Sequence, residues 1–232
     1  MSPHSENIAR RHLWITAGWL AIAHIVLIFA ATIPMHSLQL GDSPATAADA
    51  LVKSSMASSF AGGYVSYLGF LVFLVGGLLF AQLLRGDGIV PRWLSSCIAG
   101  SVVAYVAVTI STGFAAGAAA LYDGHHGADL SVITTVNDIR NLGFILCAGL
   151  AGLFAVTVGL AARATGTLPR WVTVSGVVIG AFAIVSVPGA RTGATDVSTM
   201  LFFLWFVALG IAALRLSHHE LDDAADAVPA MV

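Results

Sequence analysis

Six long runs of apolar residues, separated by more polar segments, dominate the chain. A helix rises about 1.5 Å per residue and the hydrocarbon core of a bilayer is about 30 Å thick, so about 20 apolar residues can cross it. The runs lack the period-two alternation of a membrane β-barrel, and helices satisfy every backbone amide inside lipid. The pattern therefore predicts an all-α fold, a six-transmembrane-helix bundle within residues 1–216. Its spans are expected at about Leu13–Ile33, Gly63–Leu84, Leu94–Ala116, Asn141–Ala162, Trp171–Val187 and Val197–Leu214.

The composition supports a membrane protein. Of the 232 residues, 58% are hydrophobic and only 9% are charged, whereas soluble domains carry about 25% charged residues. The net charge of −2 provides no basic surface for a nucleic-acid partner. The polar segment Met1–Arg11 precedes a run of spanning length without a small-residue cleavage site, so we expect a retained first helix. Cys97 and Cys147 are single and lie in apolar runs, which is typical of buried hydrophobic residues.

The distribution of basic residues predicts the orientation. Cytoplasmic loops of membrane proteins are enriched in Lys and Arg. The side with more of them should therefore be cytoplasmic, with both termini inside a bacterial inner (plasma) membrane. The loops at 34–62 and 117–140 then face outward, and residues 217–232 form a frayed acidic cytoplasmic tail. The seven basic residues of the cytoplasmic side are Arg10, Arg11, Arg85, Arg92, Arg163, Arg170 and Arg215, against Lys53, Arg140 and Arg191 outside.

Two of the predicted cytoplasmic loops are similar in sequence. Gly-Ile-Val-Pro-Arg-Trp-Leu at 88–94 corresponds to Gly-Thr-Leu-Pro-Arg-Trp-Val at 166–172. This similarity predicts a parallel internal repeat, in which spans 2–3 resemble spans 4–5. Proline suits the first turn of a helix, arginine reaches anionic headgroups, and tryptophan favours the membrane interface. We therefore expect Arg92, Trp93, Arg170 and Trp171 to anchor two spans at the interface.

The second of these loops also carries a resemblance. The stretch from Asp138 to about Leu214, centred on Leu168-Pro169-Arg170-Trp171, resembles a family of bacterial six-span integral membrane proteins catalogued as a domain of unknown function. Members of that family share the Leu/Val-Pro-Arg-Trp loop before a Gly/Ala-rich span, and an arginine near the outer start of the preceding span. The resemblance implies a six-span architecture and no particular activity.

Small residues recur along several spans. Gly113 and Gly117 form one GxxxG pattern, and Gly176 and Gly180 form another, while Gly149, Gly152 and Gly159 lie in span four. Because small residues let helices approach closely in lipid, we expect these glycines to hold the bundle together.

The outer end of span four holds the densest polar group near the membrane. Asp138 and Arg140 are two residues apart and so do not face each other on a helix. Their partners could be Arg191 and Asp196 in the last outer loop, which would make an ion-pair latch between helices. The alternative is an outward cavity for a polar or amphipathic ligand. The candidate binding residues here are Asn137, Asp138, Arg140, Asn141, Arg191 and Asp196.

Two further groups of residues have candidate roles. His24 lies in the middle of span one, where it could be structural, a proton relay or a haem ligand, although spans two to six offer no second histidine for haem. Asp123, His125, His126 and Asp129 lie in a predicted outer loop and could bind a metal ion with His36. The alternative for these four residues is a solvated glycine-rich loop.

No enzymatic motif stands out from this sequence. A Ser–His pair within the spans, paired cysteines and a phosphate-binding glycine loop are all missing. Two functions remain, of which the first is the prediction and the second its alternative. One is a non-enzymatic membrane module, such as a scaffold, partner subunit or sensor, whose partner is another membrane protein or a second copy of the chain. The other is a small transporter or lipophilic-ligand binder with an outward-facing cavity near Arg140. No cofactor is predicted beyond the two weak possibilities above, and the lipid bilayer is the expected environment.

Overall fold

A computed structural model describes residues 3–32, 43–53 and 55–226, and every regular element in these ranges is helical. The long helices follow the apolar runs because each run is a continuous stretch of good membrane-helix formers. Two of them contain a segment of different helical geometry, a π-helix (η1) and a 3₁₀-helix (η2). The elements are α1 (Pro3–Thr32), α2 (Pro44–Lys53), α3 (Met56–Leu83), α4 (Ile89–Val108), η1 (Thr109–Ala115), α5 (Ala116–His125), α6 (Leu130–Thr165), α7 (Arg170–Ser186), η2 (Val187–Thr192) and α8 (Ala194–Asp226).

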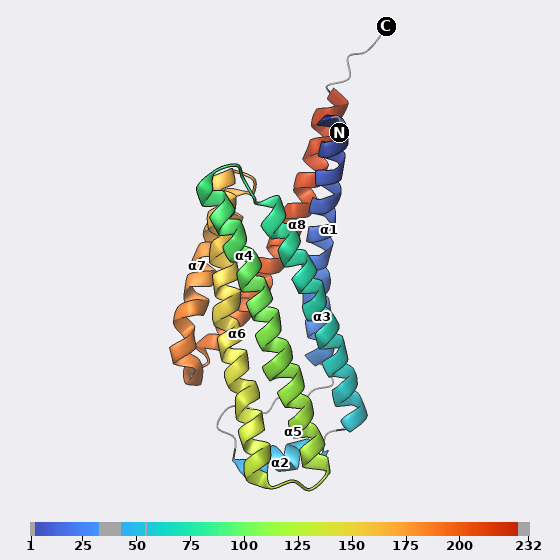
Figure 1. Ribbon diagram of the computed structural model, residues 1–232, viewed down its shortest axis with the longest axis vertical. Helices are drawn as coiled ribbons and strands as arrows, with labels where there is room; N and C mark the ends of the chain where they lie inside the picture. The colour runs from blue at the N-terminus through green and yellow to red at the C-terminus, as the bar shows by residue number, and fades with distance from the viewer. Residues whose placement is uncertain (1–2, 33–42, 54, 227–232) are drawn as a thin grey trace.

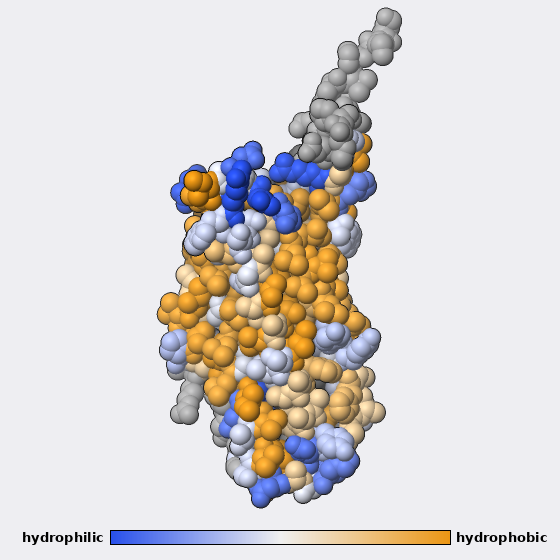
Figure 2. Space-filling view, in the orientation of Figure 1, coloured by the Kyte–Doolittle hydropathy of each residue, from blue (hydrophilic) through white to orange (hydrophobic). Residues whose placement is uncertain are grey.

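Six helical stretches are long and apolar enough to cross a bilayer, so the chain is an integral membrane protein as predicted. They form a closed ring in which α1, α3, α4, α6, α7 and α8 each contact the next, and α8 returns to α1. Figure 1 shows the start of α1, the end of α8 and the α3–α4 and α6–α7 connections at one end of the bundle. We call the opposite end, where α2 and α5 lie, the distal end. Figure 2 shows a broad apolar band between two more polar ends, which is the surface that lipid would contact.

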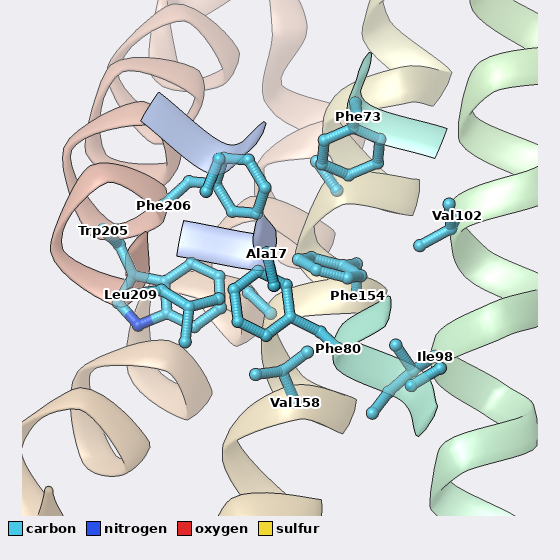
Figure 3. Packing of buried hydrophobic residues seen from close by; sticks show 14 of the residues in the cluster. Ala17, Phe73, Phe80, Ile98, Val102, Phe154, Val158, Trp205, Phe206 and Leu209 are labelled. Carbon is cyan, nitrogen blue, oxygen red and sulfur yellow. The ribbon is translucent and has the colours of Figure 1, made fainter. Parts of the chain in front are cut away.

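Aromatic residues fill the centre of the ring. Phe73 of α3 packs on Phe154 of α6 and Phe206 of α8, with ring centroids 5.3 and 5.1 Å apart. Phe80 joins this group, and Figure 3 shows these rings interleaved with aliphatic side chains from α4 and α6. Such pairs add about 0.5–1.5 kcal/mol beyond the area they bury. Side chains from three spans thus fix the relative positions of the helices.

Polar side chains join neighbouring helices inside the apolar band. The indole of Trp205 in α8 donates to the Val172 carbonyl oxygen in α7 at 3.0 Å. The Ser95 hydroxyl in α4 donates to the Ala81 carbonyl oxygen in α3 at 2.7 Å. Interhelical hydrogen bonds of this kind contribute about 0.6 kcal/mol each in membranes, so they support the packing without dominating it.

Glycines bring α6 and α7 into backbone contact. A Cβ built on Gly180 would lie 2.5 Å from the Gly152 carbonyl oxygen, and one built on Gly152 would lie 2.6 Å from the Gly180 carbonyl oxygen. Gly176 lies equally tightly against the ring of Trp205. The structure therefore shows why these positions need glycine: a larger residue would collide with the neighbouring helix. Gly113 and Gly117 differ, because they lie beside a cavity described below.

The two Pro-Arg-Trp segments lie at the same end of the bundle, at the starts of α4 and α7. Trp93 and Trp171 are 64% and 56% exposed, and both arginines are exposed. Pro91 lies within the first turn of α4, whereas Pro169 immediately precedes α7. The predicted interface anchors thus point away from the core. Their contact with a membrane, and the parallel repeat, stay predictions.

The prediction of a long outer loop at 117–140 is wrong, because most of these residues are helical. The third span continues through η1 and α5 to His125, and α6 already begins at Leu130. Hydropathy indicates only where a helix passes through lipid, so it does not detect a helix that continues into a polar environment. The other predicted outer loop, 34–62, contains α2 and the start of α3, while the tail is helical as far as Asp226.

We expect Gly180→Ala to lower the free energy of unfolding by about 1–3 kcal/mol, because the added methyl group would push α7 away from α6. Unfolding of the purified protein in detergent, followed by circular dichroism, measures this effect. Gly100→Ala is the matched control, because a Cβ at Gly100 meets no atom within 4 Å. If both variants unfold at the same temperature, the close contact of α6 with α7 does not stabilise the bundle.

Candidate functional site

A cavity of about 850 Å³ lies in the distal half of the bundle. Its walls come mainly from α3, η1, α5, α6 and α8. Ligand pockets in proteins typically measure about 300–1,000 Å³, so this space is large enough for a small organic molecule. Phe60, Phe144 and Met200 line it and are also exposed on the protein surface, so the cavity reaches the outside of the bundle.

The π-helix η1 forms one wall of this cavity. Thr109, Thr112 and Gly113 from η1 all line it. The Thr109 and Thr112 hydroxyls donate to the carbonyl oxygens of Tyr105 and Val108, each at 2.7 Å. Their oxygens can still accept a hydrogen bond. π-Helical segments are rare and are frequent at functional sites, which adds to the interest of this wall.

Arg140 brings a positive charge to the cavity. Its aliphatic stem lies on Gly117 of α5, where an added Cβ would be 3.2 Å from Arg140 Cδ. Asn141, the next residue of α6, also lines the cavity, and its amide nitrogen is buried without a hydrogen-bond partner in the described part of the chain. Two neighbouring residues of one helix thus bring hydrogen-bond donors to the same space.

The predicted polar group at 137–141 is only partly brought together. Arg140, Asn141 and Asp196 line the cavity, whereas Asn137 is buried elsewhere in the packing and Asp138 lies outside the lining. The side chain of Arg191 lies outside the described residues. The polar run lies inside α6 rather than before it, because that helix begins at Leu130.

Most of the cavity wall is apolar and aromatic. Phe70, Phe114, Phe144, Phe202 and Phe203 come from four different elements and surround the space on several sides. The polar residues Arg140, Asn141 and Asp196 are thus joined to an apolar surface. A space with one charged region and a long apolar wall matches an amphipathic molecule better than a fully polar one.

Sequence reasoning missed several lining residues. Tyr67, Tyr105 and the two threonines of η1 contribute polar atoms, and Cys147 lies beside Thr109 with their side chains 3.0 Å apart. Ser and Thr hydroxyls within a span can hydrogen-bond to the backbone of their own helix. They are therefore common in apolar spans, and a hydropathy profile does not mark them as site residues. The signal that could have found them is the run Thr-Ile-Ser-Thr-Gly at 109–113, which is unusually polar for the middle of a helix.

His24 does not line the cavity and is fully buried. Its Nδ1 lies 2.9 Å from the Gly69 carbonyl oxygen. Four phenylalanine rings surround the imidazole, with centroids between 4.9 and 6.4 Å away. A haem iron at Nε2 would require these rings to move, so the residues present do not fit that cofactor.

Two of the four predicted metal-binding residues, His126 and Asp129, have other contacts. His126 lies with its Nδ1 2.7 Å from the Tyr122 carbonyl oxygen and stacks on the Tyr122 ring. Asp129 caps α6, accepting from both the backbone N–H and the hydroxyl of Ser131 at 2.8 Å. Within the described ranges no three His, Cys, Asp or Glu side chains come together as metal ligands. His36 lies outside those ranges, so a metal site that includes it stays a prediction.

The chain was compared with known proteins at three levels, and no family model, curated protein or solved structure matches it.

Accessibility of the cavity can be tested through its native thiol. In a Cys97→Ser background, we expect methyl methanethiosulfonate to modify Cys147, because this side chain lines the cavity. Gly113→Phe should slow the modification by filling the space, since the nearest atom to an added Cβ is Thr109 Cγ2 at 3.7 Å. Mass spectrometry of the intact protein follows the reaction. Equal rates in both variants would mean that the reagent reaches Cys147 by another path.

The cap on α6 predicts a pH dependence. Hydrogen bonds from the backbone and hydroxyl of Ser131 lower the pKa of Asp129 below its ordinary value, which is about 3.9. Its contribution to stability is therefore present above that ordinary value and is lost as the pH falls through the lowered pKa. An NMR titration of the Ser131 amide should show a midpoint below the ordinary value. Asp129→Asn should keep the first turn of α6 protected from hydrogen exchange and Asp129→Ala should not.

Proposed function

We propose that this protein binds an amphipathic ligand with an acidic headgroup in the distal cavity. The observation that carries the proposal is the position of Arg140 on the wall of a large, mostly apolar cavity that reaches the surface. A guanidinium binds a carboxylate or phosphate through two parallel hydrogen bonds. The aromatic wall would bury the apolar part of the same molecule. This function is a form of the lipophilic-ligand binder, which was the alternative hypothesis from the sequence.

The arrangement of donors supports an acidic headgroup. Arg140 and the amide of Asn141 are both donors, and they are adjacent on α6. A charged residue at membrane depth is costly and is usually retained for binding or transport. Asp196 at the start of α8 also lines the cavity. A ligand that carries an amine beside its acid would find a partner there as well.

The proposal includes a location. The protein would lie in a bacterial inner membrane with both termini in the cytoplasm, because the termini and both Pro-Arg-Trp segments share one end of the bundle and carry most of the basic residues. The distal cavity would then face outward. The other hypothesis, a scaffold or partner subunit, needs no such cavity, and ligand binding distinguishes the two.

We expect dodecanoate to raise the melting temperature of the protein in a neutral maltoside detergent, and methyl dodecanoate, which lacks the charge, to have little effect. Arg140→Gln should weaken dodecanoate binding by about 10- to 100-fold, as expected for the loss of a charge-assisted hydrogen bond. Native mass spectrometry measures the bound fraction directly.

Arg163→Gln is the matched control, because Arg163 is exposed at the other end of the same helix. It should bind dodecanoate like the natural protein. If Arg140→Gln binds dodecanoate equally well, or if both substitutions weaken binding alike, Arg140 does not receive the headgroup and the scaffold hypothesis is favoured.

A further inference from the structure

Next to Phe70 and Phe203, which line the distal cavity, lies a polar atom without a hydrogen-bond partner in the part of the chain that the structure describes. The His24 ring is fully buried, and its Nε2 has no hydrogen-bond partner among the described residues. Buried polar atoms are hydrogen-bonded in the great majority of native structures, so each exception calls for a physical explanation. Leaving such an atom unpaired costs about 1–3 kcal/mol.

The hydrogen bond at the other nitrogen determines what Nε2 can do. Nδ1 lies 2.9 Å from the Gly69 carbonyl oxygen, and a carbonyl oxygen can only accept. Nδ1 therefore carries the proton of the neutral imidazole. Nε2 is left with a lone pair and is an acceptor, so the group that would satisfy it is a hydrogen-bond donor.

Two aromatic rings that contact His24 also line the cavity. Phe70 and Phe203 both line the cavity, and both meet the His24 ring edge-on, with centroids 5.6 and 6.4 Å away. Ile28, one turn further along the same face of α1, lines the cavity too. Rotation of the Phe70 or Phe203 side chain is the movement by which a ligand in the cavity would reach Nε2. Side-chain rotations of this kind need no movement of the helices.

Helix geometry gives the distance along the bundle from Arg140 to the level of the residues that contact His24. Phe70 and Phe73, which contact His24, also pack on Tyr105 of α4. Tyr105 is level with Cys147 of α6, whose sulfur is 4.0 Å from the Tyr105 carbonyl oxygen. Cys147 is two turns from Arg140, which corresponds to about 10 Å along the helix axis. A medium-length alkyl chain covers this distance.

We propose that His24 Nε2 is a second polar subsite of the cavity and accepts a hydrogen bond from a hydroxyl group on the tail of the bound amphiphile. This inference rests on the proposed function, because Arg140 is taken to hold the acidic end of the same molecule. The preferred ligand class is then an ω-hydroxylated acid rather than a plain fatty acid. An apolar tail would occupy the same cavity but would leave Nε2 without its donor.

The test compares dodecanoate with ω-hydroxydodecanoate, two probes with the same headgroup and chain. The natural protein should bind the hydroxylated probe more tightly by between about twofold and tenfold, the value of one neutral hydrogen bond. In His24→Phe the preference should reverse, because the hydroxyl would then be buried without a partner. A phenylalanine ring at this position also suits the surrounding phenylalanine rings.

A second measurement keeps the test independent of the folding of that variant. In histidine-labelled natural protein, the NMR signal of the unprotonated His24 ring nitrogen should move with ω-hydroxydodecanoate and stay in place with dodecanoate. Equal binding of the two probes, or a preference for dodecanoate, would overturn the His24 subsite and leave the Arg140 site intact. Failure of both probes to bind would overturn both proposals.

Discussion

The bundle depends on helix backbones that touch at glycines. Gly152 and Gly180 bring α6 against α7, and Gly18 and Gly210 do the same for α1 and α8, where an added Cβ on either residue would lie within 2.9 Å of the other's carbonyl oxygen. In lipid no hydrophobic driving force pulls helices together, so close van der Waals contact has to supply much of the association. These two contacts hold two sides of the ring tightly, and the aromatic centre packs between them.

The cavity lies where this tight contact ends. On the side of η1 and α5, Gly113 and Gly117 do not meet another backbone, and the helices are separated by side chains of very different size. Phe114 and Phe144 alternate there with glycine and threonine. Spaced glycines thus pack α6 closely against α7, where glycine faces glycine. The spaced glycines of η1 and α5 face larger side chains instead, and a space remains beside them.

The architecture was predictable because few kinds of secondary structure can cross a bilayer. Six apolar runs allow six helices, and this expectation is confirmed. Arg140, Asn141 and Asp196 could also be chosen from the sequence, because a charged or amide group near an apolar span is unusual. Their meeting with Tyr67, Thr109 and Thr112 could not be predicted, because it depends on the ring order of the helices and on the position of η1. The length of α5 and the early start of α6 could not be predicted either, since hydropathy does not report a helix beyond lipid.

The π-helical geometry of η1 has a consequence for the tolerance of the third span to changes in length. A turn closed by hydrogen bonds from residue i to i+5 holds about one residue more than an α-helical turn. Deletion of one residue within Thr109–Ala115 would remove this extra residue and let the segment return to α-helical geometry, so α5 would keep nearly its present orientation relative to α4. The change would fall on the cavity wall itself, because Thr109, Thr112 and Gly113 lie within this segment. A one-residue deletion here would therefore alter the ligand space while α5 and the ring of helices around Phe73 and Phe206 stay in register, so the length of this segment affects specificity as well as its sequence.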